Sequence, residues 1–127
     1  MVIFGLRVEN RTLADLDGFL HRFMSMVVSE FPDLTVVFDG HNANGETQSP
    51  IHSHGEWMAR LAPHEVERQL VARLRDDFPH HRDRIADTLM QPVSTSLVMA
   101  QACCGFVSIW GASLAKYRWV EIGRAHV

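Results

Sequence analysis

The sequence predicts an α/β domain of the Rossmann-like type, with three layers and a mostly parallel sheet. Short apolar segments that suit strands alternate with longer segments whose apolar residues recur at helical spacing. The short segment 34–38 is almost entirely apolar, which is typical of a parallel strand covered on both faces. The third observation is the order of segments near the C-terminus, where the apolar segment 105–110 is followed by Gly111 and then by a short predicted helix. Such a strand–turn–helix favours an anionic ligand at the helix N-terminus.

The first part of the chain predicts a strand, a helix and a second strand. Residues 2–8 are suited to a strand. Apolar residues at three- and four-residue spacing predict an amphipathic helix over 13–31, with Thr12 as its N-cap. Pro32 ends the helix, and 34–38 form the next strand. This order is a βαβ unit.

The middle of the chain predicts a long polar loop and then a helix. A loop as long as 41–62 inside a compact domain is usually functional or disordered. Pro63 stands at a favoured first-turn position and begins the helix, which Pro79 ends. We expect an apolar stripe of Val66, Leu70, Leu74 and Phe78, and a solvent face of Glu65, Glu67, Arg68, Arg73 and Arg75.

The last part of the chain predicts a strand, a helix, a strand and a helix. The first strand ends near Asp87 or Thr88, and Ser94 caps the helix that follows it. A strand over 105–110 and a helix over 112–120 complete the domain. The alternation of strands and helices along the whole chain is the pattern of a three-layer α/β domain.

Composition excludes several classes of protein. A net charge of −3 argues against a nucleic-acid partner, for which a basic surface is expected. No apolar run is long enough to span a bilayer, and charged residues interrupt the N-terminal run too early for a signal peptide. Cys103 and Cys104 are adjacent, so we expect two buried thiols in a reducing compartment rather than a disulfide. Together these features predict a cytoplasmic location.

The two ends of the chain suggest a fragment of a larger protein. Residues 121–127 match the translation of a common sequencing adapter, so we exclude them from the predicted domain, which spans 1–120. A core-like strand also follows Met1 at once. We therefore expect the natural protein to extend beyond this chain.

Four clusters are expected to converge at the carboxyl ends of the strands, where open parallel sheets bind ligands. They are residues 7–11, 39–42, 87–88 and 110–113. A site assembled from these clusters would suit a ligand of the nucleotide type.

Each cluster offers residues with a role in such a site. Arg7 and Arg11 could clamp a diphosphate, although both are equally consistent with surface charges. The candidates for a base that acts on a hydroxyl are Asp39, His41 and Glu56, while Asp39-Gly40 is also an ordinary turn signal. The turn that would hold a phosphate consists of Trp110, Gly111, Ala112 and Ser113.

Histidine pairs raise the question of a metal site. His52 and His54 are two apart, and His41 and Glu56 are near them in the sequence. A metal site needs three or four ligands in a defined geometry, which a long loop does not supply by spacing alone. We therefore predict no metal site.

The segment Trp110-Gly-Ala-Ser-Leu114 resembles the His-Gly-Ala-Gly-Leu segment of family 61 and related glycosyltransferases of the GT-B fold. The helix before it, the Asp39-Gly40 strand end and Ile51-His-Ser-His-Gly-Glu56 are also similar to members of this family. Trp110 replaces the histidine of the family, and Ser113 replaces its second glycine.

The resemblance implies a function and its partners. The chain would be the C-terminal, Rossmann-like half of a glycosyltransferase, which binds a nucleotide-sugar donor. The enzyme would transfer the sugar to a glycan or lipid-linked acceptor, with no metal and no cofactor beyond the donor substrate. The resemblance also implies peripheral membrane association of the full-length protein.

Two alternatives remain open. The first is a non-catalytic α/β module that binds a nucleotide or a protein partner. The second is a metal-dependent phosphatase, because Val37-Phe-Asp-Gly-His41 resembles the Val-Phe-Asp-Gly-His-Gly-Gly segment of serine/threonine phosphatases. In that family the aspartate and the glycine carbonyl bind Mn²⁺ or Mg²⁺.

Overall fold

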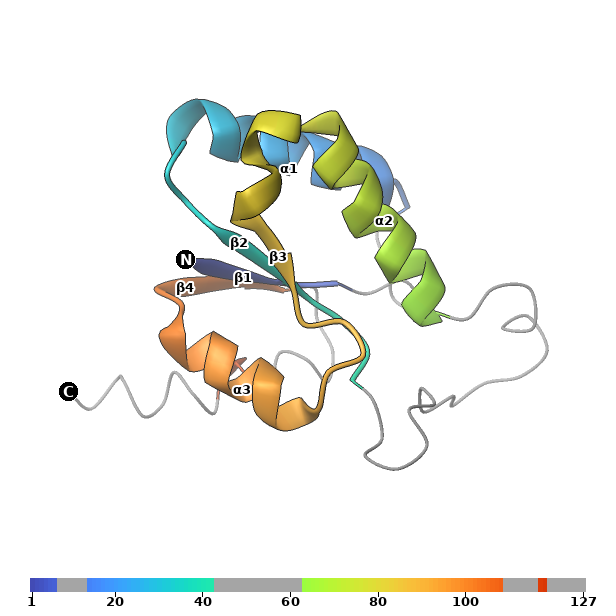
Figure 1. The fold of residues 1–127 in the computed structure, drawn as a ribbon, viewed down its shortest axis with the longest axis vertical. Helices are drawn as coiled ribbons and strands as arrows, with labels where there is room; N and C mark the ends of the chain where they lie inside the picture. Colours follow the sequence, from blue (N-terminus) through green and yellow to red (C-terminus); the bar gives the residue numbers. More distant parts are fainter. Residues whose placement is uncertain (7–13, 43–62, 109–116, 119–127) are drawn as a thin grey trace.

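The computed structural model of the chain describes residues 1–6, 14–42, 63–108 and 117–118. Within these ranges, strands and helices alternate along the chain (Figure 1). The elements in order are β1 Val2–Gly5, α1 Leu16–Glu30, β2 Val36–Asp39, α2 Pro63–Asp77, the 3-10 helix η2 Pro79–Arg84, β3 Ile85–Asp87, α3 Val93–Ala102 and β4 Gly105–Ser108.

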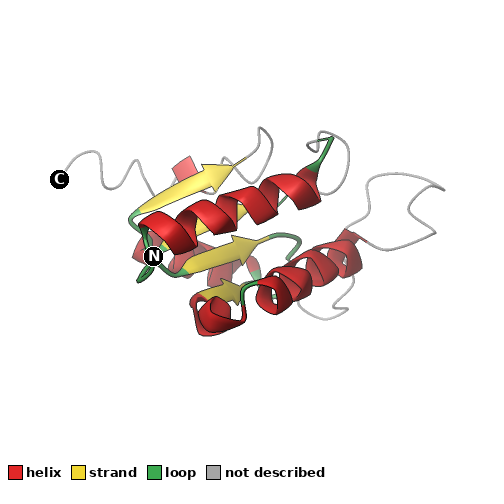
Figure 2. Cartoon of the chain, turned by 90° about the horizontal axis from the view of Figure 1, so that it is seen from above, coloured by secondary structure: helices red, strands yellow, loops and turns green. Residues whose placement is uncertain are grey.

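The described strands form one parallel sheet in the order β3-β2-β1-β4. α1 and α2 cover one face and α3 covers the other, which makes three layers (Figure 1). Seen from above, the strand arrows all point in one direction (Figure 2). The prediction of a Rossmann-like α/β domain is therefore confirmed. The strand order reverses beside β1, and open α/β sheets bind ligands at such a reversal, beyond the carboxyl ends of the strands.

Each face of the sheet has its own hydrophobic core. Ile3 and Phe4 are consecutive in β1 and therefore point to opposite faces, yet each is only 1% exposed. Phe4 packs under α1, where its ring lies 5.0 Å from the ring of Phe23. Ile3 packs on the other face with Ala100 of α3 and with Tyr117. Burial on both faces explains why the strand segments of this sequence are so uniformly apolar.

The start of α1 differs from the prediction. The helix begins at Leu16 rather than at residue 13, because the Asp15 carboxylate caps it by accepting a hydrogen bond from the Gly18 amide at 3.1 Å. Thr12, the predicted cap, lies outside the described residues. The first strand is also shorter than predicted, since β1 ends at Gly5.

The second half of the chain confirms β3, corrects the start of α3 and adds one element. α3 begins at Val93 with Pro92 as its N-cap, so Ser94 lies inside the helix and does not cap it. The 3-10 helix η2, which follows α2 directly, was not predicted. α3 is apolar but short, and none of the helices in the described part of the chain is long and apolar enough to cross a membrane.

The adjacent cysteines have different environments. Cys103 is buried in the core beneath α3, as predicted, and is 2% exposed. Cys104 is exposed, and its thiol donates a hydrogen bond to the Met1 carbonyl at 3.2 Å. The prediction of burial was therefore wrong for Cys104, because the chain leaves α3 there and enters the sheet. Neither cysteine forms a disulfide.

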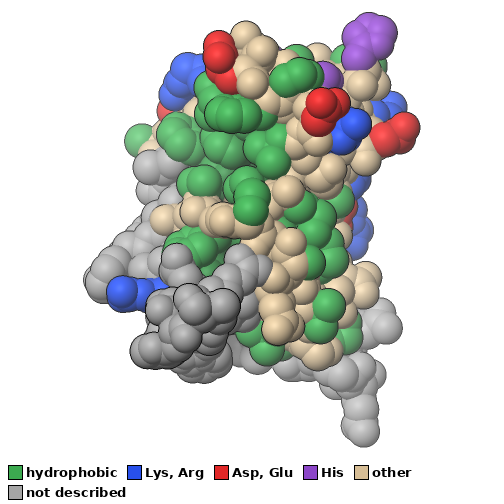
Figure 3. Space-filling model, turned by 90° about the vertical axis from the view of Figure 1, so that its left-hand side faces the viewer, with side chains coloured by type: hydrophobic (Ala, Val, Ile, Leu, Met, Phe, Trp, Pro, Cys, Tyr) green, Lys and Arg blue, Asp and Glu red, His purple; other side chains and the backbone are tan. Residues whose placement is uncertain are grey.

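The face at the amino ends of the strands is largely hydrophobic (Figure 3). Hydrophobic side chains gather over its upper and middle parts, and charged side chains lie around its upper rim. Phe31, which follows α1 on the way to β2, is 55% exposed. The polar and titratable clusters described below lie at the opposite end of the sheet, at the carboxyl ends of its strands.

Candidate functional site

The strands of the sheet end at nearly the same level, which brings their last residues together. Gly5 of β1 pairs in register with Asp39 of β2 on one side and with Ser108 of β4 on the other. Asp87 of β3 pairs with Phe38, so Thr88 reaches the level of Asp39. The predicted convergence of residues 39–42 with residues 87–88 is thus confirmed. The clusters at 7–11 and 110–113 lie outside the described residues, and their convergence stays a prediction.

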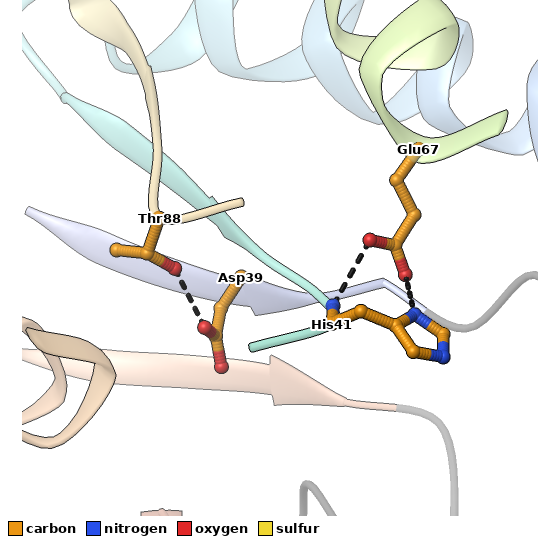
Figure 4. Close-up of polar contacts among 4 residues, drawn as sticks. All are labelled: Asp39, His41, Glu67 and Thr88. Atoms are coloured by element: carbon orange, nitrogen blue, oxygen red, sulfur yellow. Dashed lines mark hydrogen bonds and ion pairs between the residues drawn. The ribbon is translucent and has the colours of Figure 1, made fainter. Parts of the chain in front are cut away.

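Asp39 is the centre of a buried network of hydroxyl groups. Its Oδ1 accepts hydrogen bonds from Thr88 Oγ1 and Ser96 Oγ, each at 2.6 Å, and its Oδ2 accepts one from the Tyr117 hydroxyl at 2.6 Å. Figure 4 shows Thr88 pointing toward this carboxylate. Asp39 is only 1% exposed. Charge-assisted hydrogen bonds of this kind offset the cost of burying a carboxylate.

The network links four parts of the fold that are distant in the sequence. Ser96 lies on α3, and its hydroxyl also accepts a hydrogen bond from Asn42 Nδ2 at 2.7 Å. Tyr117 packs closely over Gly5, where an added Cβ would lie 3.0 Å from the phenol oxygen. A side chain at position 5 would therefore crowd the Tyr117 hydroxyl. The contacts hold α3 and Tyr117 against the ends of β1 and β2.

Tyr117 gives this network a measurable pH dependence. Burial, followed by the negative charge of Asp39, raises the pKa of its phenol above the usual value of 10.0. Below about pH 10 the phenol is protonated in both folded and unfolded chains. Above it only the unfolded chain loses the proton, so stability should fall by about 1.4 kcal/mol per pH unit from this group.

Tyr117 is the only tyrosine in the sequence, so absorbance at 295 nm reports its ionisation alone. We expect no phenolate in the folded chain at pH 10 to 11, and phenolate to appear together with alkaline unfolding. The Tyr117→Phe variant should lose the part of the alkaline destabilisation that this group causes. Ordinary ionisation near pH 10 without unfolding would contradict the buried hydrogen bond.

His41 and Glu67 form a second cluster at the same edge of the sheet. The His41 Nδ1 atom lies 2.5 Å from Glu67 Oε1, and the His41 backbone N–H donates to Glu67 Oε2 at 2.9 Å. The Glu67 side chain is completely buried, while the His41 side chain is 19% exposed. Figure 4 shows that the other ring nitrogen of His41 points away from Glu67. A buried carboxylate thus fixes the orientation of a partly exposed imidazole.

The position of Glu67 corrects the prediction that it lies on the solvent face of its helix. Leu70, Val71 and Leu74 of α2 are buried, and Glu67 stands three, four and seven residues before them. That spacing places Glu67 on the buried stripe of the helix. The signal was therefore present in the sequence. A glutamate in line with buried apolar residues requires a partner, and His41 is that partner.

Gly40 is the residue that lets Glu67 approach the end of β2. An added Cβ at this position would lie 2.5 Å from Glu67 Cδ and 2.8 Å from Glu67 Oε1, which is closer than atoms can pack. Because the carboxylate is completely buried and bound to His41, moving it aside would disturb both of its hydrogen bonds to that residue. Gly40 is thus required by a close approach, whereas the sequence identified it only as a turn residue.

Gly40→Ala should therefore separate His41 from Glu67 without changing either residue. We expect a loss of about 1–2 kcal/mol in the free energy of unfolding, because Glu67 loses its partners while it stays buried. The His41 imidazole resonances should change in NMR spectra. Gly105→Ala is the matched control, since an added Cβ there meets nothing within 4 Å. If Gly40→Ala leaves the His41 resonances unchanged, the close approach is incorrect.

Residues 41–42, which follow β2, also form hydrogen bonds with the connection between β3 and α3, on the side away from Glu67. The Met90 amide donates to the His41 carbonyl at 2.9 Å, and Asn42 Nδ2 donates to the Gln91 carbonyl at 3.1 Å. Met90 has a φ of 58°, in the left-handed region that non-glycine residues seldom adopt. Strained backbone of this kind is frequent at functional sites. His41 is thus held by contacts from two sides of the sheet end.

The described part of the site contains two of the predicted residues, Asp39 and His41. Sequence reasoning missed Glu67 as a site residue, and it did not identify the hydrogen bond from Tyr117 to Asp39. Among the described residues, no group of three or more potential ligands could hold a metal ion. The other predicted site residues lie outside the described ranges; they are Arg7, Arg11, Glu56, Trp110, Gly111, Ala112 and Ser113. His52 and His54, which were considered as metal ligands, lie outside these ranges as well.

Comparisons of the chain with models of protein families, with curated proteins and with solved structures found no match. The site itself is therefore the basis for a functional proposal.

Proposed function

We propose that this chain is the donor-binding domain of a glycosyltransferase and that His41 is its general base. The observation that supports the proposal is the His41–Glu67 pair, which stands at the carboxyl edge of a Rossmann-like sheet. A buried carboxylate bound to Nδ1 keeps a histidine in the tautomer whose Nε2 can accept a proton. That is the state a base needs when an acceptor hydroxyl attacks a sugar.

In the proposed reaction, the acceptor oxygen forms a bond to C1 of the donor sugar. The bond between C1 and the diphosphate oxygen breaks, and the nucleoside diphosphate leaves with the bonding electrons. The hydroxyl proton passes to His41 Nε2, and the negative charge of Glu67 stabilises the imidazolium that forms. In this proposal Arg7, Arg11 and residues 110–113, which follow β1 and β4 in the sequence, hold the diphosphate.

Asp39 has a different role in this proposal. Its carboxylate is 1% exposed and accepts hydrogen bonds from three hydroxyl groups. A base must reach the proton that it removes, so His41 is better placed than Asp39. We assign Asp39 to the rigid support of the sheet end. The same contacts disfavour the phosphatase alternative, which requires Asp39 to bind a metal ion.

A transfer assay tests the proposal. The enzyme that contains this domain is incubated with UDP-glucose, UDP-N-acetylglucosamine or GDP-mannose and with a set of methyl glycosides as acceptors. Release of nucleoside diphosphate and formation of the new glycoside are measured by mass spectrometry. We expect His41→Gln to lower the transfer rate about 10²-fold. His80→Gln is the matched control, because His80 is exposed on η2.

The non-catalytic module remains the second candidate, and one observation favours it. Glu67 also accepts a hydrogen bond from the His41 backbone, so the pair anchors α2 to the end of β2 whether or not it does chemistry. Nucleotide-sugar binding without transfer would support this candidate. The absence of both binding and transfer would overturn the glycosyltransferase proposal.

A further inference from the structure

The two outer strands of the described sheet, β3 and β4, differ in how their edges are protected. At β3, Arg75 Nε donates a hydrogen bond to the Ile85 carbonyl at 3.0 Å, and the same guanidinium pairs with Asp87 at 2.8 Å. β4, Gly105–Ser108, contains no charged residue and no proline. Charges and prolines are the features that keep an exposed edge from pairing with another strand. Among the described strands, β4 is therefore the edge suited to pairing.

The side of β4 that faces the layer of α1 and α2 is uncovered. Val107 pairs with Phe4, which packs under α1, so Val107 and Gly105 point to that side of the sheet. Val107 is 36% exposed, and a Cβ added at Gly105 would meet nothing within 4 Å. Seen from above, α1 and α2 lie over the other strands and leave β4 uncovered (Figure 2). β4 thus forms an open apolar surface beside α1.

The flank of α1 on the side of β4 is apolar as well. The opposite flank of the helix faces α2, where Asp17 pairs with Arg73 at 2.7 Å. Phe19 and Met26 are turned about half a revolution away from Asp17, so they lie on the flank that faces away from α2. Phe19 is only partly buried, and Met26 is 44% exposed. Two neighbouring apolar surfaces, one on α1 and one on β4, therefore lack a cover.

We infer that β4 is a dimerisation edge, at which β4 of a second copy of this chain pairs in the antiparallel direction. A two-fold axis perpendicular to the sheet relates two identical strands in this direction, and two-fold symmetry is the commonest in homodimers. The pairing joins the two sheets into one. It also places the α1 helices of both copies on the same side of the joined sheet. The inference goes beyond the proposed function and does not depend on it.

A second copy fits this edge better than a single added strand. Neighbouring strands are about 4.8 Å apart, so the two β1 strands of the dimer would be separated by about 14 Å. α1 lies over β1, and packed helices are about 8–10 Å apart, so the space between the two α1 helices holds side chains but no further helix. Phe19 and Met26 of both copies would fill this space above Val107. A single strand would leave these side chains exposed.

The charge distribution also suits contact between identical surfaces. A two-fold interface brings each surface against its own copy, so a charged patch there would repel itself. Residues 88–115, which include β4, contain no charged side chain, although charged residues make up 21% of the whole chain. Two copies of β4 can therefore approach without repulsion between like charges.

Sedimentation equilibrium of the whole chain over a range of concentrations tests the inference. We expect a dimer whose dissociation constant rises at least about tenfold in Val107→Lys and in Met26→Glu, because each variant places a charge in the apolar contact. Val98→Lys is the matched control, since Val98 is 64% exposed on α3, on the other side of the sheet. Circular dichroism verifies that each variant is folded.

NMR on a mixture of ¹³C-labelled and unlabelled chains locates the contact. Nuclear Overhauser effects between the two copies should involve the methyl groups of Val107 and Met26. A chain that stays monomeric at every concentration overturns the inference, as does a dimer that dissociates in Val98→Lys but not in the other variants. If Val107→Lys does not fold, Met26→Glu decides the result, because it changes no residue of the sheet. An unchanged dimer in Met26→Glu then contradicts the inference.

Discussion

Asp39→Ala should lower the free energy of unfolding by about 3–5 kcal/mol, the largest effect expected of any single substitution in the described part of the chain. The hydroxyl groups of Thr88, Ser96 and Tyr117 would all lose their charged acceptor inside the fold. Each hydrogen bond to a charged group contributes about 1.5–3 kcal/mol, and the contributions of one network are not additive. Urea unfolding monitored by circular dichroism measures the change.

Asp39→Asn is the control that separates charge from shape. The asparagine keeps one oxygen for Thr88 and Ser96, while its amide can donate to the Tyr117 oxygen. We therefore expect a smaller loss of about 1–2 kcal/mol. Equal effects of Asp39→Ala and Asp39→Asn would show that charge dominates the network. A loss below about 1 kcal/mol in Asp39→Ala would contradict the buried network itself.

Glu67→Gln should lower the rate of sugar transfer about 10²-fold while the chain stays folded. The amide of glutamine can donate a hydrogen bond to His41 Nδ1, which favours the tautomer that carries its proton on Nε2. In that tautomer His41 cannot act as a base. The amide oxygen can still accept the hydrogen bond from the His41 backbone, so the end of β2 should remain in place.

The rate effect of Glu67→Gln is measured in the transfer assay with saturating donor, together with the midpoint of urea unfolding. Glu30→Gln is the matched control, because Glu30 is an exposed glutamate at the end of α1. An unchanged transfer rate in Glu67→Gln would show that Glu67 does not orient His41 for catalysis. The His41–Glu67 pair would then serve only to anchor α2 to the end of β2. A large drop in stability would instead show that its charge supports the fold.

The sequence was sufficient to predict the architecture, because strands that are buried on both faces of the sheet consist almost entirely of apolar residues. Apolar strands such as β2, which runs over Val36–Asp39 rather than the predicted 34–38, and apolar stripes such as that of α2 follow directly from a parallel sheet between two helical layers. Boundaries were less accurate, since caps depend on single contacts. The Asp15 carboxylate accepts from the Gly18 amide and caps α1, and such a contact depends on the backbone geometry at that position.

The site was harder to predict than the fold. Asp39 and His41 were identified because they follow a buried strand, where ligands of such sheets bind. Their partners come from distant segments, and pairs such as Asp39 with Tyr117 have no signature in local spacing. Glu67 could have been found, because it interrupts an apolar stripe. The close approach of Gly40 to Glu67 is a tertiary contact that the sequence indicates only as a turn.

The most direct test of the central claim is to map where a nucleotide-sugar and an acceptor glycoside bind. Backbone amide resonances of the ¹⁵N-labelled chain are followed as UDP-glucose and then the glycoside are added. If the carboxyl edge is the functional site, the largest shifts among the described residues should fall on residues 40–42 and 88–91. Shifts confined to the amino ends of the strands, or no shifts with any donor and acceptor tested, would contradict the claim.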